Sequence, residues 1–247
     1  MKVSLFPTCL GDQFYPGVAD SVARVLRRQG CDVRTPLAEA CCGQPAWNSG
    51  YPNEARKVAR RLIQAFAGAD YVVSPSGSCC GMIRHNFAQL FHDDPAFLSE
   101  AQAFADRVHE FSQFMVGVLG VTQLAASFPH RVTFHPSCHG ARLLGVKTEP
   151  LTLLKAIPDL ELVPLEHADD CCGFGGTFAV KLSAISVAIV DEKVGHVQDS
   201  GASYLVGTDL GCLMNIAGRM RVRRINAEPI HIAELIDRAL DAGGAGA

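Results

Sequence analysis

Neither sign of charge predominates in this 247-residue sequence, which has 22 Lys+Arg against 25 Asp+Glu and a formal net charge of −3 at pH 7. That balance provides no general attraction to nucleic acid or to an anionic membrane surface, so we expect neither partner. No run reaches the roughly 18 uninterrupted apolar residues of a membrane-spanning helix. The first residues, MKVSLFPTCLGDQF, lack a long apolar segment followed by a small-residue cleavage site, so we expect no secretory signal and a cytoplasmic, reducing location.

Several common functional patterns are missing as well. The glycine-rich segment Gly173–Gly176 lacks the G-x-G-x-x-G spacing that follows a strand in nucleotide-binding loops. Neither a Ser/His/Asp set nor a pair of carboxylates can be assigned from spacing alone. The sequence therefore names no catalytic residue.

Cysteine, in contrast, is abundant, with 10 residues among 247. This fraction is about half of what a small disulfide-stabilised scaffold contains. In a reducing compartment, patterned cysteines indicate metal or redox chemistry more often than structural disulfides.

Eight of the ten cysteines form two quartets with one pattern, a single Cys, then Cys-Cys-Gly, then a single Cys. The first quartet is Cys9, Cys41, Cys42 and Cys79, and the second is Cys138, Cys171, Cys172 and Cys212. The context repeats too, because VSLFPTC before the first quartet matches VTFHPSC before the second. We interpret the repeat as an internal duplication with halves 1–125 and 126–247.

Strand-like and helix-like segments alternate within each half. Residues 2–6 and 131–135 are typical of short buried strands. Helical spacing of apolar residues predicts helices over 17–29, 54–67 (with Asn53 as N-cap), 100–119, 179–198 and 230–240. The predicted fold class is α/β, as two tandem pseudo-symmetric halves, each a small, largely parallel sheet flanked by helices.

In such a fold, ligands bind in loops that follow the strands, where helix N-termini point at them. Cys9, Cys79, Cys138 and Cys212 all follow strand-like runs. A thiol at a helix N-terminus has a lowered pKa and binds metal readily.

Three kinds of chemistry fit four thiolates per half. An iron–sulfur cluster takes soft thiolate ligands, and four cysteines suit a four-iron cluster. A zinc-stabilised structural or interaction module is an alternative, although neither quartet contains the usual C-x₂-C pair. A thiol–disulfide reductase is another, because a disulfide between adjacent cysteines would be strained and labile.

Four further residues near the quartets need an interpretation. Cys31 begins a strand-like segment and is expected to be a buried small hydrophobe. Cys80 adjoins Cys79 and is a possible fifth ligand, although Leu213 occupies the matching place in the second half. His135 and His139 flank Cys138 and are candidate hydrogen-bond donors to cluster sulfurs, while a strand-capping role for His135 is equally open.

The quartets and their surroundings resemble a known family, the cysteine-rich CCG proteins, which include a component of heterodisulfide reductase and the iron–sulfur subunit of glycolate oxidase. The pattern is most similar to the lactate-utilization protein A family, whose members carry two CCG-type halves. The resemblance covers nearly the whole chain, and its most specific segments are CCGQPAWNSG (41–50), HPSC (135–138) and CCGFGGTF (171–178).

This resemblance implies an iron–sulfur subunit that passes electrons in an oxidoreductase complex converting L-lactate to pyruvate. It implies two other lactate-utilization proteins as partners, one of them a larger iron–sulfur protein. It also implies that each quartet holds a cluster, so that the chain carries one or two [4Fe–4S] clusters, with zinc as the alternative.

One departure from the resemblance concerns the end of the motif. In heterodisulfide reductase the motif ends in C-x-x-C, which supplies a fifth thiolate. Here Met82 stands three residues after Cys79, and Asn215 stands three residues after Cys212. Four-cysteine clusters are therefore expected in place of the five-cysteine arrangement that supports disulfide cleavage.

Overall fold

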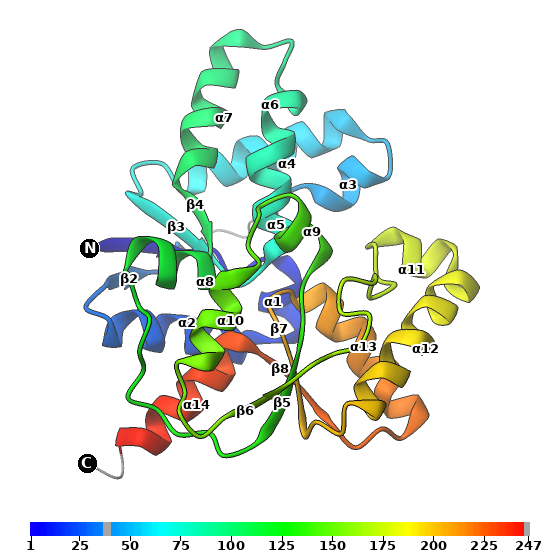
Figure 1. Cartoon of the computed structure of the whole chain (residues 1–247). Coiled ribbons are helices and arrows are strands. Elements are labelled where there is room, and N and C mark those ends of the chain that lie inside the picture. The colour runs from blue at the N-terminus through cyan, green and yellow to red at the C-terminus, as the bar shows by residue number, and fades with distance from the viewer. Residues whose placement is uncertain (37–40, 245–247) are drawn as a thin grey trace.

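The computed structural model describes residues 1–36 and 41–244, and its described strands form two four-stranded sheets (Figure 1). The sheets have the same order, β2-β1-β3-β4 and β6-β5-β7-β8, and every neighbouring pair is parallel. The strands are β1 (Lys2–Leu5), β2 (Asp32–Arg34), β3 (Tyr71–Ser74), β4 (Val108–Glu110), β5 (Arg131–His135), β6 (Glu161–Val163), β7 (Tyr204–Gly207) and β8 (Glu228–His231). The predicted α/β fold with two similar halves is confirmed.

Helices connect the strands and flank both sheets. In the first half they are α1 (Cys9–Phe14), α2 (Pro16–Arg28), α3 (Gln44–Asn48), α4 (Pro52–Ala65), α5 (Gly77–Gly81), α6 (Phe87–Leu90), α7 (Pro95–Arg107) and α8 (Phe111–Gln113), with π-helical turns η1 (Met82–Asn86) and η2 (Phe114–Val118). In the second half they are α9 (Cys138–Arg142), α10 (Thr148–Lys155), α11 (Thr177–Lys181), α12 (Ser183–Asp199), α13 (Leu210–Arg223) and α14 (Ile232–Gly244). None of the described helices has the length and apolar content of a membrane-spanning segment.

Helix α2 illustrates how the sequence specifies these elements. Pro16 opens the helix, where its missing N–H is not needed. Val18, Val22 and Leu26 form one fully buried face. Gly30 then takes a positive φ of 79°, a conformation in which glycine has no Cβ penalty, and the chain turns into β2.

Four of the helix predictions are wrong in detail. The helix predicted over 230–240 begins only at Ile232, because Ile230 and His231 belong to strand β8. The predicted helix 100–119 breaks at Val108, because residues 108–110 leave it to pair with β3 as strand β4. The predicted helix 179–198 is divided at Leu182 into α11 and α12. Helix α4 is capped at Tyr51, so Asn53 lies inside its first turn and is not the N-cap.

The last helices of each half pack against the other half. Helix α14 of the second half packs on α2 of the first, and the two lie side by side in Figure 1. Conversely, α8 and η2 of the first half pack on α10 of the second. As a result, one apolar core joins residues of both sheets, including Val3, Leu5, Val132 and Val206. The halves therefore share one buried apolar core.

Candidate metal centres

Four of the eight quartet cysteines stand at helix N-termini. Cys9 and Cys138 are the first residues of α1 and α9, whereas Cys79 and Cys212 are the third residues of α5 and α13. Each helix is capped by the side chain of a polar residue that accepts a backbone N–H: Thr8, Ser137, Ser76 and Asp209, respectively. The helix N-termini thus place a positive backbone potential at all four sulfur atoms.

The adjacent cysteines supply the other half of each quartet. Cys41 and Cys42 lie just before α3, separated from it by Gly43 alone, whereas residues 173–176 separate Cys171 and Cys172 from α11. The structure brings the thiols together: Sγ–Sγ distances are 3.7 Å for Cys9–Cys41, 3.3 Å for Cys42–Cys79 and 3.0 Å for Cys172–Cys212. Cysteines that are 32 to 40 positions apart in the sequence therefore converge as two groups of sulfur atoms.

In each quartet, hydrogen bonds lower the pKa of one thiol and so favour its ionised form. Hydrogen bonds from Cys42 and Cys9, together with the N–H of Gly43, lower the pKa of Cys41 far below that of a free thiol. In the second quartet, hydrogen bonds from Cys138 and Cys172 and from the N–H of Gly173 lower the pKa of Cys171 in the same way. Each site thus offers a thiolate, the form that binds a metal.

Both quartets open onto one cavity of about 440 Å³ between the halves. Its walls include Cys9, Cys42 and Cys79 on one side and the whole second quartet on the other. It lies at the carboxyl ends of the strands, where parallel sheets place their ligands. Two sets of four soft donors, each with a thiolate stabilised by backbone N–H groups, fit thiolate-ligated metal groups.

A buried carboxylate joins the two halves beside this cavity. Oδ1 of Asp209 accepts the N–H groups of Gly211 (3.1 Å) and Cys212 (3.3 Å) in its own helix. Oδ2 accepts the Oγ–H of Ser76 (3.0 Å) and the N–H of Ser78 (2.8 Å) in the first half. One side chain therefore positions the N-termini of both α5 and α13, which carry Cys79 and Cys212.

Close packing and polar contacts hold other parts of the cavity wall. Helices α5 and α9 approach so closely that a Cβ on Gly77 would lie 3.0 Å from the Cα of Gly140. Gln44 Nε2 lies 2.8 Å from His139 Nδ1, which links the two halves at the cavity. His139 thus bonds a side chain of the opposite half.

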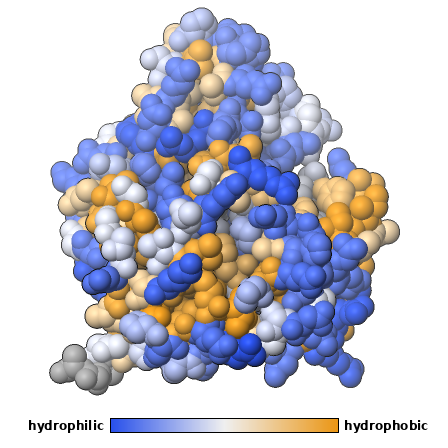
Figure 2. Space-filling model, viewed as in Figure 1, coloured by the Kyte–Doolittle hydropathy of each residue, from blue (hydrophilic) through white to orange (hydrophobic). Residues whose placement is uncertain are grey.

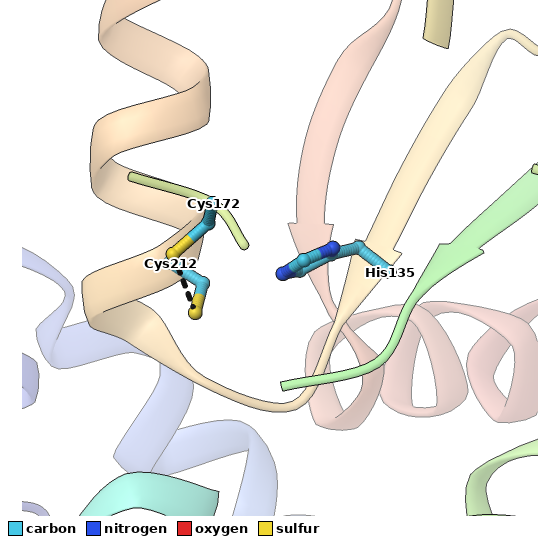
Figure 3. A group of neighbouring side chains, drawn as sticks. All are labelled: His135, Cys172 and Cys212. Carbon is cyan, nitrogen blue, oxygen red and sulfur yellow. Dashed lines mark hydrogen bonds between the residues drawn. The ribbon is translucent and has the colours of Figure 1, made fainter. Parts of the chain in front are cut away.

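His135 points from the end of β5 toward the second quartet (Figure 3). A ring nitrogen of His135 and the Sγ atoms of Cys172 and Cys212 lie within 4.8 Å of one another. The side chain is buried, and neither ring nitrogen has a hydrogen-bond partner among the described residues. Burial lowers the pKa of the imidazole to about 4, so the ring is neutral near pH 7.

The two remaining cysteines lie away from the cavity. Cys31 is buried in the shared apolar core, in line with the expectation of a small hydrophobe. Cys80 is fully buried among the apolar residues of the first half, beside Ser74 and the carboxyl group of Glu110. Its thiol does not line the cavity, which gives no support to a role as fifth ligand.

An apolar surface adjoins the second centre. Hydrophobic residues gather over α11 and the start of α12 on the face shown in Figure 2. Val180, Leu182 and Ile185 are 82%, 50% and 52% exposed there. Val180 also lines the cavity, so this surface continues into its rim.

Sequence reasoning missed Asp209 and the polar caps of the cysteine-bearing helices. The signal was present, since a Ser, Thr or Asp stands just before each helix begins, which is typical of N-caps. The link from Asp209 to the first half had no local signal, because Ser76 is 133 residues away.

Comparison with known proteins agrees with this duplicated architecture. The CCG family, described as a cysteine-rich domain, matches the chain twice, over residues 3–84 and 132–217. "Lactate utilization protein A" of Geobacillus kaustophilus (strain HTA426) is 50% identical over 237 residues, which cover 96% of this chain and 99% of the relative. The chain belongs to the lactate utilization protein A family.

Other comparisons add detail. "Lactate utilization protein A 2" of Bacillus cereus (strain 03BB102) is 44% identical over 241 residues, or 98% of this chain and all of the relative. Among solved structures, glutamate racemase from Francisella tularensis covers 98% of this chain and 80% of its own, with a TM-score of 0.37 and 11% identity. That level of likeness carries no argument about function.

Proposed function

We propose that this member of the lactate utilization protein A family is an iron–sulfur electron-transfer subunit in the oxidation of L-lactate to pyruvate. The observation that carries the proposal is the convergence of two cysteine quartets on one cavity. The relatives' names supply the substrate. All ten cysteines are free thiols, which suits a reducing cytoplasm.

The bound clusters would supply one-electron oxidation and reduction, and the chain's own residues would hold them. Cys9, Cys41, Cys42 and Cys79 would ligate one cluster, and Cys138, Cys171, Cys172 and Cys212 the other. The N–H groups of Gly43 and Gly173 would stabilise the thiolates that they already contact. Two one-electron centres match the two electrons that oxidation of a 2-hydroxy acid releases.

Charge around the cavity favours electron transfer over substrate oxidation in this chain. Among the described residues that line it, none is a lysine or an arginine, while Asp209 carries a carboxyl group. A lactate carboxylate bound there would lack the permanently cationic partner that carboxylate-binding sites usually provide. Oxidation of the substrate is therefore assigned to a partner, one of two other lactate-utilization proteins, of which the larger iron–sulfur protein is one.

The test is metal analysis of protein purified without oxygen. We expect a brown protein with absorbance near 400 nm that contains iron and acid-labile sulfide. Cys41→Ser and Cys171→Ser should each lose the iron of one half. Cys31→Ser is the matched control and should keep all of it, because Cys31 lies in the apolar core. Equal iron loss from Cys31→Ser would contradict the ligand assignment.

A zinc-stabilised module is the second candidate, and one observation favours it. A tetrahedral zinc ion with sulfur at about 2.3 Å places neighbouring sulfurs roughly 3.8 Å apart, close to the 3.7 Å between Cys9 and Cys41. Colourless protein with stoichiometric zinc and no sulfide would establish this alternative and overturn electron transfer.

A further inference from the structure

The two candidate centres differ at one matched position. Three residues before Cys138 stands His135, and three residues before Cys9 stands Phe6. Both side chains are buried. Phe6 packs edge-on against Phe66, with ring centroids 5.7 Å apart, within the apolar core of the first half. His135 instead faces Cys172 and Cys212 (Figure 3).

The burial of His135 needs a partner that the described protein residues do not supply. Both of its ring nitrogens are enclosed and without a hydrogen-bond partner. Leaving a buried donor or acceptor unpaired costs about 1–3 kcal/mol, and native proteins rarely do so. Two charged groups nearby are already engaged: Lys193 donates to the carbonyls of His167 and Ala168, and Asp209 accepts four hydrogen bonds.

We propose that His135 is a positioning residue of the second centre, which donates a ring N–H hydrogen bond to sulfur of the group held by Cys172 and Cys212. The inference rests on the proposed function. It deepens that function by making the two centres unequal, since Phe6 offers the first centre no donor. A hydrogen bond to cluster sulfur stabilises the more negative, reduced state, so the second centre has the higher potential and electrons settle there.

The experiment is a potentiometric titration of the iron-loaded protein, followed by electron paramagnetic resonance. His135→Phe reproduces the side chain of the first half and should keep the iron. It should lower the reduction potential of one centre by about 59 mV, which corresponds to a tenfold smaller equilibrium constant for its one-electron reduction. His135→Gln, which keeps an N–H donor, should recover part of the shift. Phe6→Leu, the matched control, should shift neither potential.

Each other outcome has a separate meaning. Unchanged potentials in iron-loaded His135→Phe would overturn the inference and leave the proposed function intact. Loss of one cluster from His135→Phe, together with strong nitrogen hyperfine coupling in the wild type, would also overturn it, because His135 would then be a ligand. Wild-type protein without iron would overturn the proposed function itself, and the inference with it.

Discussion

Asp209→Ala tests whether one carboxylate organises both centres. The side chain is 3% exposed and accepts four hydrogen bonds, two from α13 and two from the first half. Loss of an N-cap costs about 1 kcal/mol. The N–H of Ser78 would also lose its acceptor, which costs about 1–3 kcal/mol. We therefore expect the free energy of unfolding to fall by about 3 kcal/mol.

Asp209→Ser separates the two contributions. Serine caps α5 at the matched position, where Ser76 Oγ accepts the N–H of Cys79. A serine at 209 should therefore keep the α13 cap but lose the link to the first half, with a cost of about 2 kcal/mol. Ser137→Ala is the control, because it removes the cap of α9 and no hydrogen bond of Asp209, and it should cost about 1 kcal/mol.

Two assays measure these effects. Urea unfolding of the reduced protein gives the stability differences, and metal content gives the effect on the sites. Because Asp209 contacts the N-termini of α5 and α13, which carry Cys79 and Cys212, Asp209→Ala should lower metal binding in both halves. A change in unfolding free energy of less than about 0.5 kcal/mol, the range of ordinary surface substitutions, would refute this role for Asp209, and so would loss of metal from the second centre alone.

Two further predictions concern buried groups near the centres. Burial raises the pKa of Glu110 to about 7, so its stabilising contribution is present below its unfolded pKa and is lost as pH rises through 7. Relative to Glu110→Gln, the wild type should lose about 3 kcal/mol of unfolding free energy between pH 5 and pH 8. Urea unfolding at a series of pH values measures this loss, and an equal pH dependence of the unfolding free energy in the two proteins would contradict it. Gly173 has a φ of 77°, and an added Cβ would lie 2.7 Å from the carbonyl oxygen of Ser186. Gly50 has a similar φ, but a Cβ added there would meet nothing within 4 Å. Gly173→Ala should therefore destabilise the protein by at least about 2 kcal/mol more than Gly50→Ala. Equal thermal shifts for the two alanine variants would rule out the clash.

The duplication could be predicted because the same residues recur at matched positions of the two halves. Matched cysteines and matched strand-like runs placed Cys9 and Cys138 after equivalent strands, and the structure has them at equivalent helix starts. Strand β4 could not be predicted in this way. Its three residues are too few to show alternation, and Val108 also fits the apolar spacing of the preceding helix, so only pairing with β3 decides its conformation.

Contacts between the halves could not be predicted from local sequence patterns, for a similar reason. The packing of α14 on α2 joins segments that are about 200 residues apart, and nothing in either helix specifies its partner. The apolar face of α2 predicted burial but not what would cover it. Likewise, Asp209 carries an ordinary N-cap signal, while its bonds to Ser76 and Ser78 depend on how the two halves pack together.

Three differences between the halves fall within a few residues of a quartet cysteine. At matched positions of the two repeats, Phe6 corresponds to His135, Ser76 to Asp209 and Cys80 to Leu213. In the first and third pairs, one half has a side chain that can hydrogen-bond or ionise and the other half has an apolar one. In the second pair, a serine N-cap in the first half corresponds to an aspartate N-cap in the second. The cysteines themselves are unchanged. A duplicated chain that keeps its cysteines and changes the polar groups around them retains two similar sites with two different electrostatic environments. Under the proposed function, that difference would direct electrons from one site to the other.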